Sequence, residues 1–96
     1  MHTKNLEKQL QEWRHDFHTC PELNFDLEVT SPKVEKLLND FGYEVHSGIG
    51  KTGMVGVLKN GSSKQSIGIR ADMDALPVEE VNEFEYRSQH PGKMHA

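Results

Sequence analysis

The spacing of apolar residues changes near residue 43, and this change constrains the fold more than any other feature of the sequence. Before it, apolar residues recur at intervals of four, three and four, which is the stripe of an amphipathic helix. These residues are Leu6, Leu10, Trp13 and Phe17. We expect this helix over roughly residues 4–18, with Thr3 as its N-cap and Pro21 ending the segment.

A second helical stripe consists of Val34, Leu37, Leu38 and Phe41. Its start is open between two alternatives. Either Ser31 caps a helix that has Pro32 at its first position, or the helix begins near Glu28 and keeps Pro32 inside its first turn. Gly42 suits the left-handed conformation that follows a last helical turn, so the helix is expected to end just before it.

Short runs rich in β-branched residues follow this second helix. Residues 43–45 begin a short strand, and we expect a loop at 47–53. The runs 54–58 and 66–70 each hold a glycine among aliphatic residues, which fits a sheet closely covered by helices. An Asn60-Gly61 pair lies between these two runs, so we expect them to form an antiparallel hairpin.

The order helix, helix, strand, hairpin and loop predicts an α/β or α+β fold, with two helices packed on a partial mixed sheet. Residues beyond Pro77 are acidic and irregular and are expected to form a loop. Nothing in the sequence supplies a further layer over the helix stripes and the strands. We therefore expect marginal stability and a tendency to self-associate or aggregate.

Composition limits the classes to which the protein can belong. Apolar residues are 34% of the chain and Cys20 is its single cysteine, so the core is small and no disulfide framework exists. We expect a packed or half-exposed thiol there. The net charge of −4 and the scattered lysines and arginines argue against a nucleic-acid partner. No apolar run is long enough to cross a membrane, and no secretory signal is visible, so a cytoplasmic protein is expected.

The strongest local sign of chemistry is the pair Asp72 and Asp74, directly after the run that ends at residue 70. Polar residues at the carboxyl end of a sheet strand lie where α/β proteins place ligands. The two carboxylates are able to bind a divalent ion, or one of them is able to orient a ligand histidine. A structural role is the third interpretation, with each aspartate capping or turning the chain. Spacing alone leaves these alternatives open.

The chain has six histidines, which is many for its length. His15 and His18 lie three positions apart on the first helix, whereas a helical metal pair favours a spacing of four. We therefore expect these two side chains to be solvated or placed at the helix end. His90 and His95 flank a Pro-Gly turn and have no chelating neighbour in the sequence.

Four segments resemble, in the same order, the signatures of one family. The family patterns are R-x-x-H-x-x-P-E-L-x-F, G-I-G-x-T-G-V-V-G-V-L, L-R-A-D-M-D-A-L-P and P-G-K-M-H-A. Their counterparts in this chain are residues 14–25, with one more residue between Arg14 and His18 than the first pattern has, and residues 48–58, 69–77 and 91–96. The family comprises bacterial and plant amidohydrolases, among them hippurate hydrolase, N-acyl-amino-acid amidohydrolases and auxin-conjugate hydrolases, in the aminoacylase and carboxypeptidase-like metallopeptidase clan.

The resemblance implies roles for three residues. Asp74 corresponds to the family's aspartate near the metal centre, where it orients or supports ligands. Asp72 falls where other members of the clan place a metal-binding histidine, and His95 lies two residues before the family's metal-binding cysteine, so both are expected to line the site. The family's metal ligands and its general-base glutamate, which activates water, come after the position of Ala96. No metal ligand is therefore assigned within the 96 residues.

The resemblance also implies a zinc-peptidase-like catalytic domain, of which residues 1–96 form an incomplete N-terminal part without the dimerisation domain. The expected activity of the full-length family is cleavage of the amide bond in small N-acylated amino acids or peptides, hippurate-like substrates included. A pair of divalent ions, zinc, manganese, cobalt or nickel, is expected to assist it. The 96 residues alone are expected to be inactive and to hold no metal. The alternative is a non-catalytic protein that binds a partner through its uncovered faces.

Overall fold

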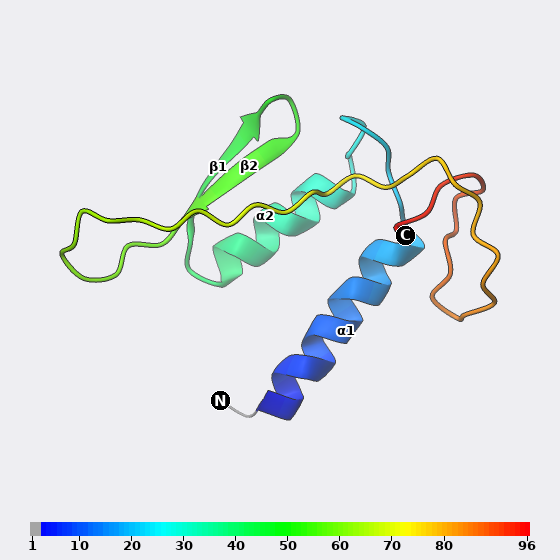
Figure 1. The fold of residues 1–96 in the computed structure, drawn as a ribbon, viewed down its shortest axis with the longest axis horizontal. Helices are drawn as coiled ribbons and strands as arrows, with labels where there is room; N and C mark the ends of the chain where they lie inside the picture. The colour runs from blue at the N-terminus through cyan, green and yellow to red at the C-terminus, as the bar shows by residue number, and fades with distance from the viewer. Residues whose placement is uncertain (1–2) are drawn as a thin grey trace. The chain divides into compact units, whose positions relative to one another are not determined.

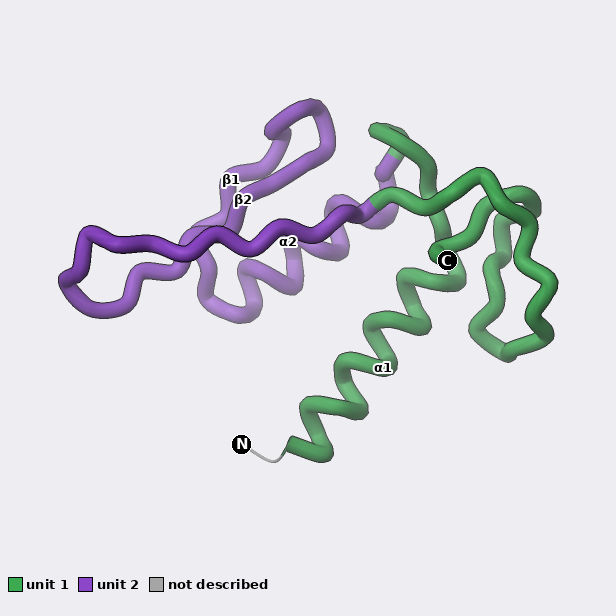
Figure 2. Tube along the Cα trace, viewed as in Figure 1, with its two compact units in different colours: residues 1–26, 74–96 green, residues 27–73 purple. Residues whose placement is uncertain are grey.

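The computed structural model describes residues 3–96. The chain forms two compact units, coloured separately in Figure 2. The first unit contains the segments up to Asp26 and from Asp74 to Ala96, and the second contains Leu27–Met73. Figure 1 labels the helices and strands. Helix α1 (Thr3–Thr19) belongs to the first unit, whereas helix α2 (Thr30–Asp40) and both strands belong to the second, as the colours of Figure 2 show.

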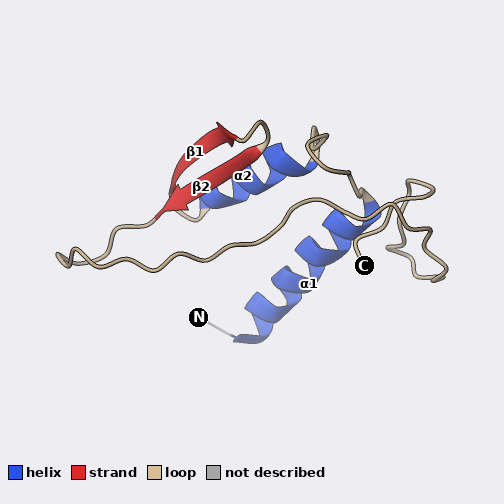
Figure 3. Ribbon diagram, turned by 45° about the horizontal axis from the view of Figure 1, so that its top comes forward, coloured by secondary structure: helices blue, strands red, loops and turns tan. Residues whose placement is uncertain are grey.

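The second unit consists of one helix packed on a two-stranded antiparallel sheet (Figure 3). Its elements are α2 (Thr30–Asp40), β1 (Glu44–Ile49) and β2 (Gly53–Val57). Gly56 lies under the helix, where an added Cβ would come within 3.2 Å of the Tyr43 ring and 3.5 Å of Leu38. The sheet is therefore closely covered at Gly56, as the glycine in this run predicted. The expected combination of helices with a partial sheet and a hairpin is confirmed, although the described sheet is antiparallel rather than mixed.

Helix α2 follows the second of the two predicted starts. It begins at Thr30, so Pro32 lies within its first turn, where proline is tolerated. Ser31 is not a cap: its hydroxyl donates a hydrogen bond to the Thr52 carbonyl at 2.7 Å and joins the helix start to the hairpin loop. Gly42 has a φ of 91° and ends the helix in the left-handed conformation, as expected.

The hairpin lies elsewhere in the sequence than predicted. Strand β1 continues through residues 47–49, which were expected to be a loop, and it pairs with β2 from Glu44 opposite Val57 to Ile49 opposite Gly53. The connection is only Gly50–Thr52, with Gly50 and Lys51 at positive φ. A strand pairs most readily with its nearest neighbour across a short loop, because a short loop loses less entropy on closure. The predicted hairpin between 54–58 and 66–70 was therefore wrong.

Residues 66–70 form no strand in the structure, which corrects the third predicted strand. The run is extended, but within residues 3–96 it has no neighbouring strand with which to pair. Ile67 and Ile69 are 92% and 95% exposed. Strand character is only realised when a partner supplies hydrogen bonds, so β-rich composition was not sufficient here.

The first unit is built from helix α1 (Thr3–Thr19) and the irregular segment that returns to its end. The helix agrees with the range predicted from its apolar stripe. Pro21 is fully buried and Ala75 is 4% exposed, and both lie in the core of this unit. Residues beyond Pro77 form neither helix nor strand, as expected. No helix among the described residues has the length and apolar character needed to span a bilayer.

Candidate functional site

Three of the four family-like segments meet in the first unit through backbone hydrogen bonds. The Ala75 N–H donates to the Glu22 carbonyl at 2.7 Å, and Leu23 pairs with Ala75 as a parallel bridge. Leu76 and Met94 exchange two hydrogen bonds of 2.9 and 3.0 Å in an antiparallel bridge. Segments more than fifty positions apart are thus held side by side. Asp74 and His95, two of the predicted site residues, are direct chain neighbours of these paired positions.

His95 lies within a cluster of ionisable groups. Desolvation lowers the pKa of His95, the charge of His18 lowers it further, and the carboxylates of Asp74 and Glu22 oppose this shift. The His95 Nε2 is buried and has no hydrogen-bond partner among residues 3–96. A buried polar atom without a partner is uncommon in folded proteins. That His95 lines a site stays a prediction from the sequence.

The two predicted aspartates have different surroundings. Asp74 is exposed and belongs to the first unit, where its charge acts on His95. Asp72 belongs to the second unit and is also exposed, and its Oδ1 lies 2.6 Å from the Arg70 guanidinium. The structure therefore connects Asp74 with His95, and it gives Asp72 an ion pair on its own strand-like run.

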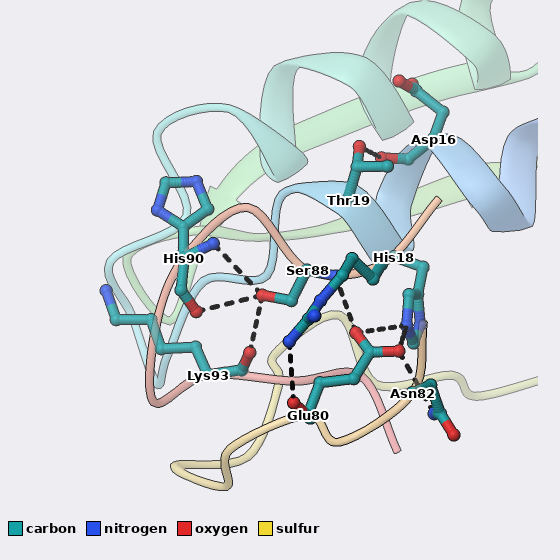
Figure 4. Close-up of polar contacts among 9 residues, drawn as sticks. Asp16, His18, Thr19, Glu80, Asn82, Ser88, His90 and Lys93 are labelled. Carbon is teal, nitrogen blue, oxygen red and sulfur yellow. Dashed lines mark hydrogen bonds and ion pairs between the residues drawn. The ribbon is translucent and has the colours of Figure 1, made fainter. Parts of the chain in front are cut away.

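Sequence reasoning missed a buried ion pair between His18 and Glu80 (Figure 4). His18 Nε2 lies 3.0 Å from both carboxylate oxygens of Glu80, and the two residues are 7% and 3% exposed. Of the two expected positions for His18, solvated or at the helix end, the second is found: His18 lies in the last turn of α1, where it is buried. The partners are 62 positions apart, so no local pattern could have revealed the pair.

Further donors hold the Glu80 carboxylate in place. The Ser88 N–H donates to it at 2.6 Å and the Asn82 amide at 3.2 Å. These contacts lower the pKa of Glu80 to about 2, and the hydrogen bond from Ser88 is the main cause. Desolvation raises the pKa of this carboxyl group, and the hydrogen bond with His18 opposes that effect. The Arg87 guanidinium also donates to the Glu80 carbonyl at 3.0 Å. One carboxylate thus fixes the irregular 80–88 segment to the end of α1.

An aromatic cluster surrounds this pair. Tyr86 stacks on His15 with ring centres 3.6 Å apart and on Phe84 at 4.8 Å, and it meets the His18 ring edge-on at 5.9 Å. His15 was expected to be solvated, but one face of its ring is covered by Tyr86. The cluster adds apolar contact to the polar attachment of the 80–88 segment.

Cys20 is half-buried, as expected, and its Sγ lies 3.4 Å from His90 Nε2. The Pro-Gly turn beside His90 is ordered by Ser88, whose hydroxyl donates to the carbonyls of His90 at 3.0 Å or Lys93 at 2.7 Å (Figure 4). Glu79 also accepts a hydrogen bond from the Gly92 N–H. This turn leads into the Met94 bridge and so determines where His95 lies.

The described residues do not make up a metal site by themselves. Among residues 3–96, no group of three or more histidine, cysteine, aspartate or glutamate side chains is arranged to hold a metal ion. Asp74 and the free nitrogen of His95 offer two groups, which is fewer than the three or four protein ligands usual for zinc.

Comparison with known proteins gives the context of these segments, although no protein-family model matches the chain. The chain is 49% identical over 92 residues to a hippurate hydrolase of Campylobacter jejuni, a match that covers 96% of this chain and 24% of that protein. It is 43% identical over 84 residues to an N-acyl-L-amino acid amidohydrolase of Geobacillus stearothermophilus, covering 88% and 23%.

A solved structure, the YXEP protein of Bacillus subtilis, is described as a dinuclear metal-binding peptidase of the M20 family. It superposes with a TM-score of 0.88 at 33% identity, over 96% of this chain and 26% of that one. The chain thus spans about a quarter of the length of the proteins that it matches. Sequence and backbone agree over nearly all of the chain, which therefore belongs to the family of the M20 peptidases and the related amidohydrolases.

Proposed function

We propose that this chain is the N-terminal part of the catalytic domain of a metal-dependent amidohydrolase that cleaves the amide bond of N-acyl amino acids. The observation that carries the proposal is the meeting of three family-like segments on one set of backbone hydrogen bonds. This arrangement brings Asp74 and His95 together from positions far apart in the sequence. The relatives named as hippurate hydrolase and N-acyl-amino-acid amidohydrolase support this substrate class.

In this proposal the chain contributes scaffold and positioning groups. Asp74 supports or orients the ligands of a divalent metal pair, and His95 and Asp72 line the site. The metal pair, zinc, manganese, cobalt or nickel, takes its ligands from outside residues 3–96, since the described side chains do not form a set that holds it. The description of a related structure as dinuclear supports two ions rather than one.

A chimera tests the role of Asp74. Residues 1–96 replace the matching quarter of the Campylobacter jejuni hippurate hydrolase, and hydrolysis of hippurate is measured with manganese, cobalt or zinc present. We expect the chimera to be active and Asp74→Asn to lower kcat/KM by about 10–100-fold, the usual effect of losing a group that orients metal ligands. Metal content is determined in parallel, because loss of orientation also weakens metal retention.

Asp26→Asn is the matched control, because Asp26 is an exposed aspartate of the same unit. It is expected to leave kcat/KM and metal content unchanged. An active chimera in which Asp74→Asn behaves like Asp26→Asn would remove Asp74 from the site. A folded chimera with full metal content and no hydrolysis of any N-acyl amino acid would argue against the proposed substrate class.

A second candidate function is binding of a partner without catalysis. The specific observation that favours it is the nearly complete exposure of Ile67 and Ile69 on an extended run. Isolated exposed apolar residues are ordinary on protein surfaces, but two on one unpaired strand-like run form a surface suited to another strand.

A further inference from the structure

The backbone just before His95 is held from two sides. The peptide between Lys93 and Met94 donates its N–H to the Leu76 carbonyl at 3.0 Å, and its carbonyl accepts a hydrogen bond from the Ser88 hydroxyl at 2.7 Å (Figure 4). The next peptide, between Met94 and His95, accepts a hydrogen bond from the Leu76 N–H at 2.9 Å. Peptide groups are planar, so holding two consecutive planes leaves Met94 little rotation and determines where His95 begins.

Ser88 also bonds the other end of the turn that leads to this peptide. Its hydroxyl accepts a hydrogen bond from the His90 N–H at 3.2 Å, and it donates to the His90 carbonyl at 3.0 Å as the alternative to Lys93. The Lys93 N–H donates to the same His90 carbonyl at 3.2 Å. One hydroxyl therefore joins the first and last residues of the 90–93 turn.

A buried carboxylate holds Ser88 in turn. The Ser88 N–H donates to Glu80 at 2.6 Å, and Glu80 is 3% exposed. The same carboxylate lies 3.0 Å from His18 Nε2 in the last turn of α1. A side chain orients its neighbours well only when it is itself held by packing and hydrogen bonds. These contacts run from the end of α1 through Glu80 and Ser88 to the peptide before His95.

We propose that Ser88 is a positioning residue of the amidohydrolase site, whose hydroxyl holds the Lys93–Met94 peptide and thereby sets where the His95 ring lies. This role rests on the proposed function, in which His95 lines the site. Without the hydroxyl, the Lys93 carbonyl and the His90 N–H lose this side-chain partner. The Lys93–Met94 peptide is then held by Leu76 alone.

The charges around His95 make its position measurable. Burial and the charge of His18 lower the pKa of His95, whereas the carboxylates of Asp74 and Glu22 raise it. A displaced ring is exposed to a different balance of solvent and of these three charges. The titration of His95 therefore reports where its ring lies.

An NMR titration of the imidazole protons in the 96-residue chain tests the proposal. In Ser88→Ala we expect the pKa of His95 to rise toward its ordinary value of 6.5, because a ring that is held less firmly is better hydrated. Ser88→Thr keeps the hydroxyl and is expected to restore the lowered pKa. A merely structural role of Ser88 would lower the urea midpoint of unfolding without moving the pKa of His95 in the folded chain.

Ser63→Ala is the matched control, because the exposed Ser63 hydroxyl also accepts a backbone hydrogen bond, from the Gln65 N–H at 3.1 Å. It is expected to leave the pKa of His95 unchanged. His46 of strand β1 is the internal reference, and its titration should be the same in every variant. Circular dichroism establishes that each variant keeps its helices.

The chimera with the Campylobacter jejuni hippurate hydrolase gives a second measurement, which does not require the 96 residues to fold alone. There Ser88→Ala is expected to lower kcat for hippurate about tenfold, since small displacements of site groups are costly to rate, and to change KM by less than about twofold. Ser88→Thr should recover most of the lost kcat. Ser63→Ala should leave both constants unchanged.

Two results would overturn the proposal. One is a Ser88→Ala chain that keeps its helices and the lowered pKa of His95. The other is an active chimera in which Ser88→Ala has the same kcat as Ser63→Ala. If the chimera is inactive but the titration of His95 responds to Ser88→Ala, the placement of His95 by Ser88 is supported and the proposed amidase function is contradicted instead.

Discussion

The carboxylate of Glu80 shows how much one residue organises in the first unit. It accepts hydrogen bonds from a side chain of α1, from an amide two positions away and from the backbone of Ser88. Because the segment it holds has no helix or strand of its own, these contacts replace the backbone hydrogen bonds that secondary structure would supply. The segment then leads through the Pro-Gly turn to His95.

The lowered pKa of Glu80 predicts a dependence of stability on pH. A carboxyl group that ionises more readily when folded stabilises the protein above its ordinary pKa of 4.5, and this stabilisation is lost as the pH falls toward about 2. Glu80→Gln is therefore expected to lower the urea midpoint of unfolding at pH 7. The difference from the unaltered chain should shrink between pH 4.5 and pH 2.

Glu83→Gln serves as the control, because Glu83 is an exposed glutamate of the same segment. It should leave the midpoint unchanged at each pH. If the effect of Glu80→Gln were equally large at pH 2 and at pH 7, the ionised carboxylate would not be the source of the stabilisation.

Among the elements, the two helices were predicted well because their signals are local. Helix periodicity and the glycine after α2 act within a few residues, so the sequence shows them directly. The strands depend on a partner. β-Rich composition identified the runs 54–58 and 66–70 but not which segment would lie beside them, and β1 became the partner of β2 through a shorter loop. The short loop between β1 and β2 determined which strands form the hairpin, and the Asn60-Gly61 pair did not.

Gly42 gives a test at the scale of an element. It connects α2 to β1 at a φ of 91°, and nothing lies within 4 Å of its missing Cβ. Gly42→Ala is therefore expected to destabilise the protein by about 1–2 kcal/mol through backbone strain alone, the cost of the left-handed conformation for an ordinary residue. Denaturant unfolding followed by circular dichroism measures this change.

Gly42→Asn provides the comparison, because asparagine adopts the left-handed conformation more readily than alanine. It should be intermediate in stability between the unaltered chain and Gly42→Ala. Equal stability of all three proteins would mean that the turn relaxes to another conformation, and the positive φ would then not govern the connection.

At the scale of the whole molecule, the chain has family-like positioning groups without a set of metal ligands among its described residues. We predict that the 96-residue chain alone shows no turnover of hippurate or N-acetyl amino acids with added zinc, manganese or cobalt. Calorimetry should likewise detect no tight stoichiometric metal binding, because too few protein ligands are present. A chain-free reaction is the reference for turnover, and a chelator titration is the reference for heat.

Turnover above that reference, or one metal bound per chain with high affinity, would show that residues 1–96 hold a site of their own. If the 96-residue chain alone shows no turnover, an active chimera indicates that missing groups, rather than an inability of these residues to fold, are the cause. The cytoplasmic location and the absence of a nucleic-acid partner inferred from the sequence stay predictions.

The sequence by itself determined the family resemblance and both helices, and it predicted Asp74 and His95 as site residues. These rest on residue type and on spacing along the chain, which need no three-dimensional information. Only the tertiary structure decided that Asp74 and His95 lie in one cluster, that Glu80 pairs with His18, and that the 66–70 run is left unpaired. The reason is physical: each of these depends on groups tens of positions apart, whose proximity follows from packing and backbone hydrogen bonds rather than from local pattern.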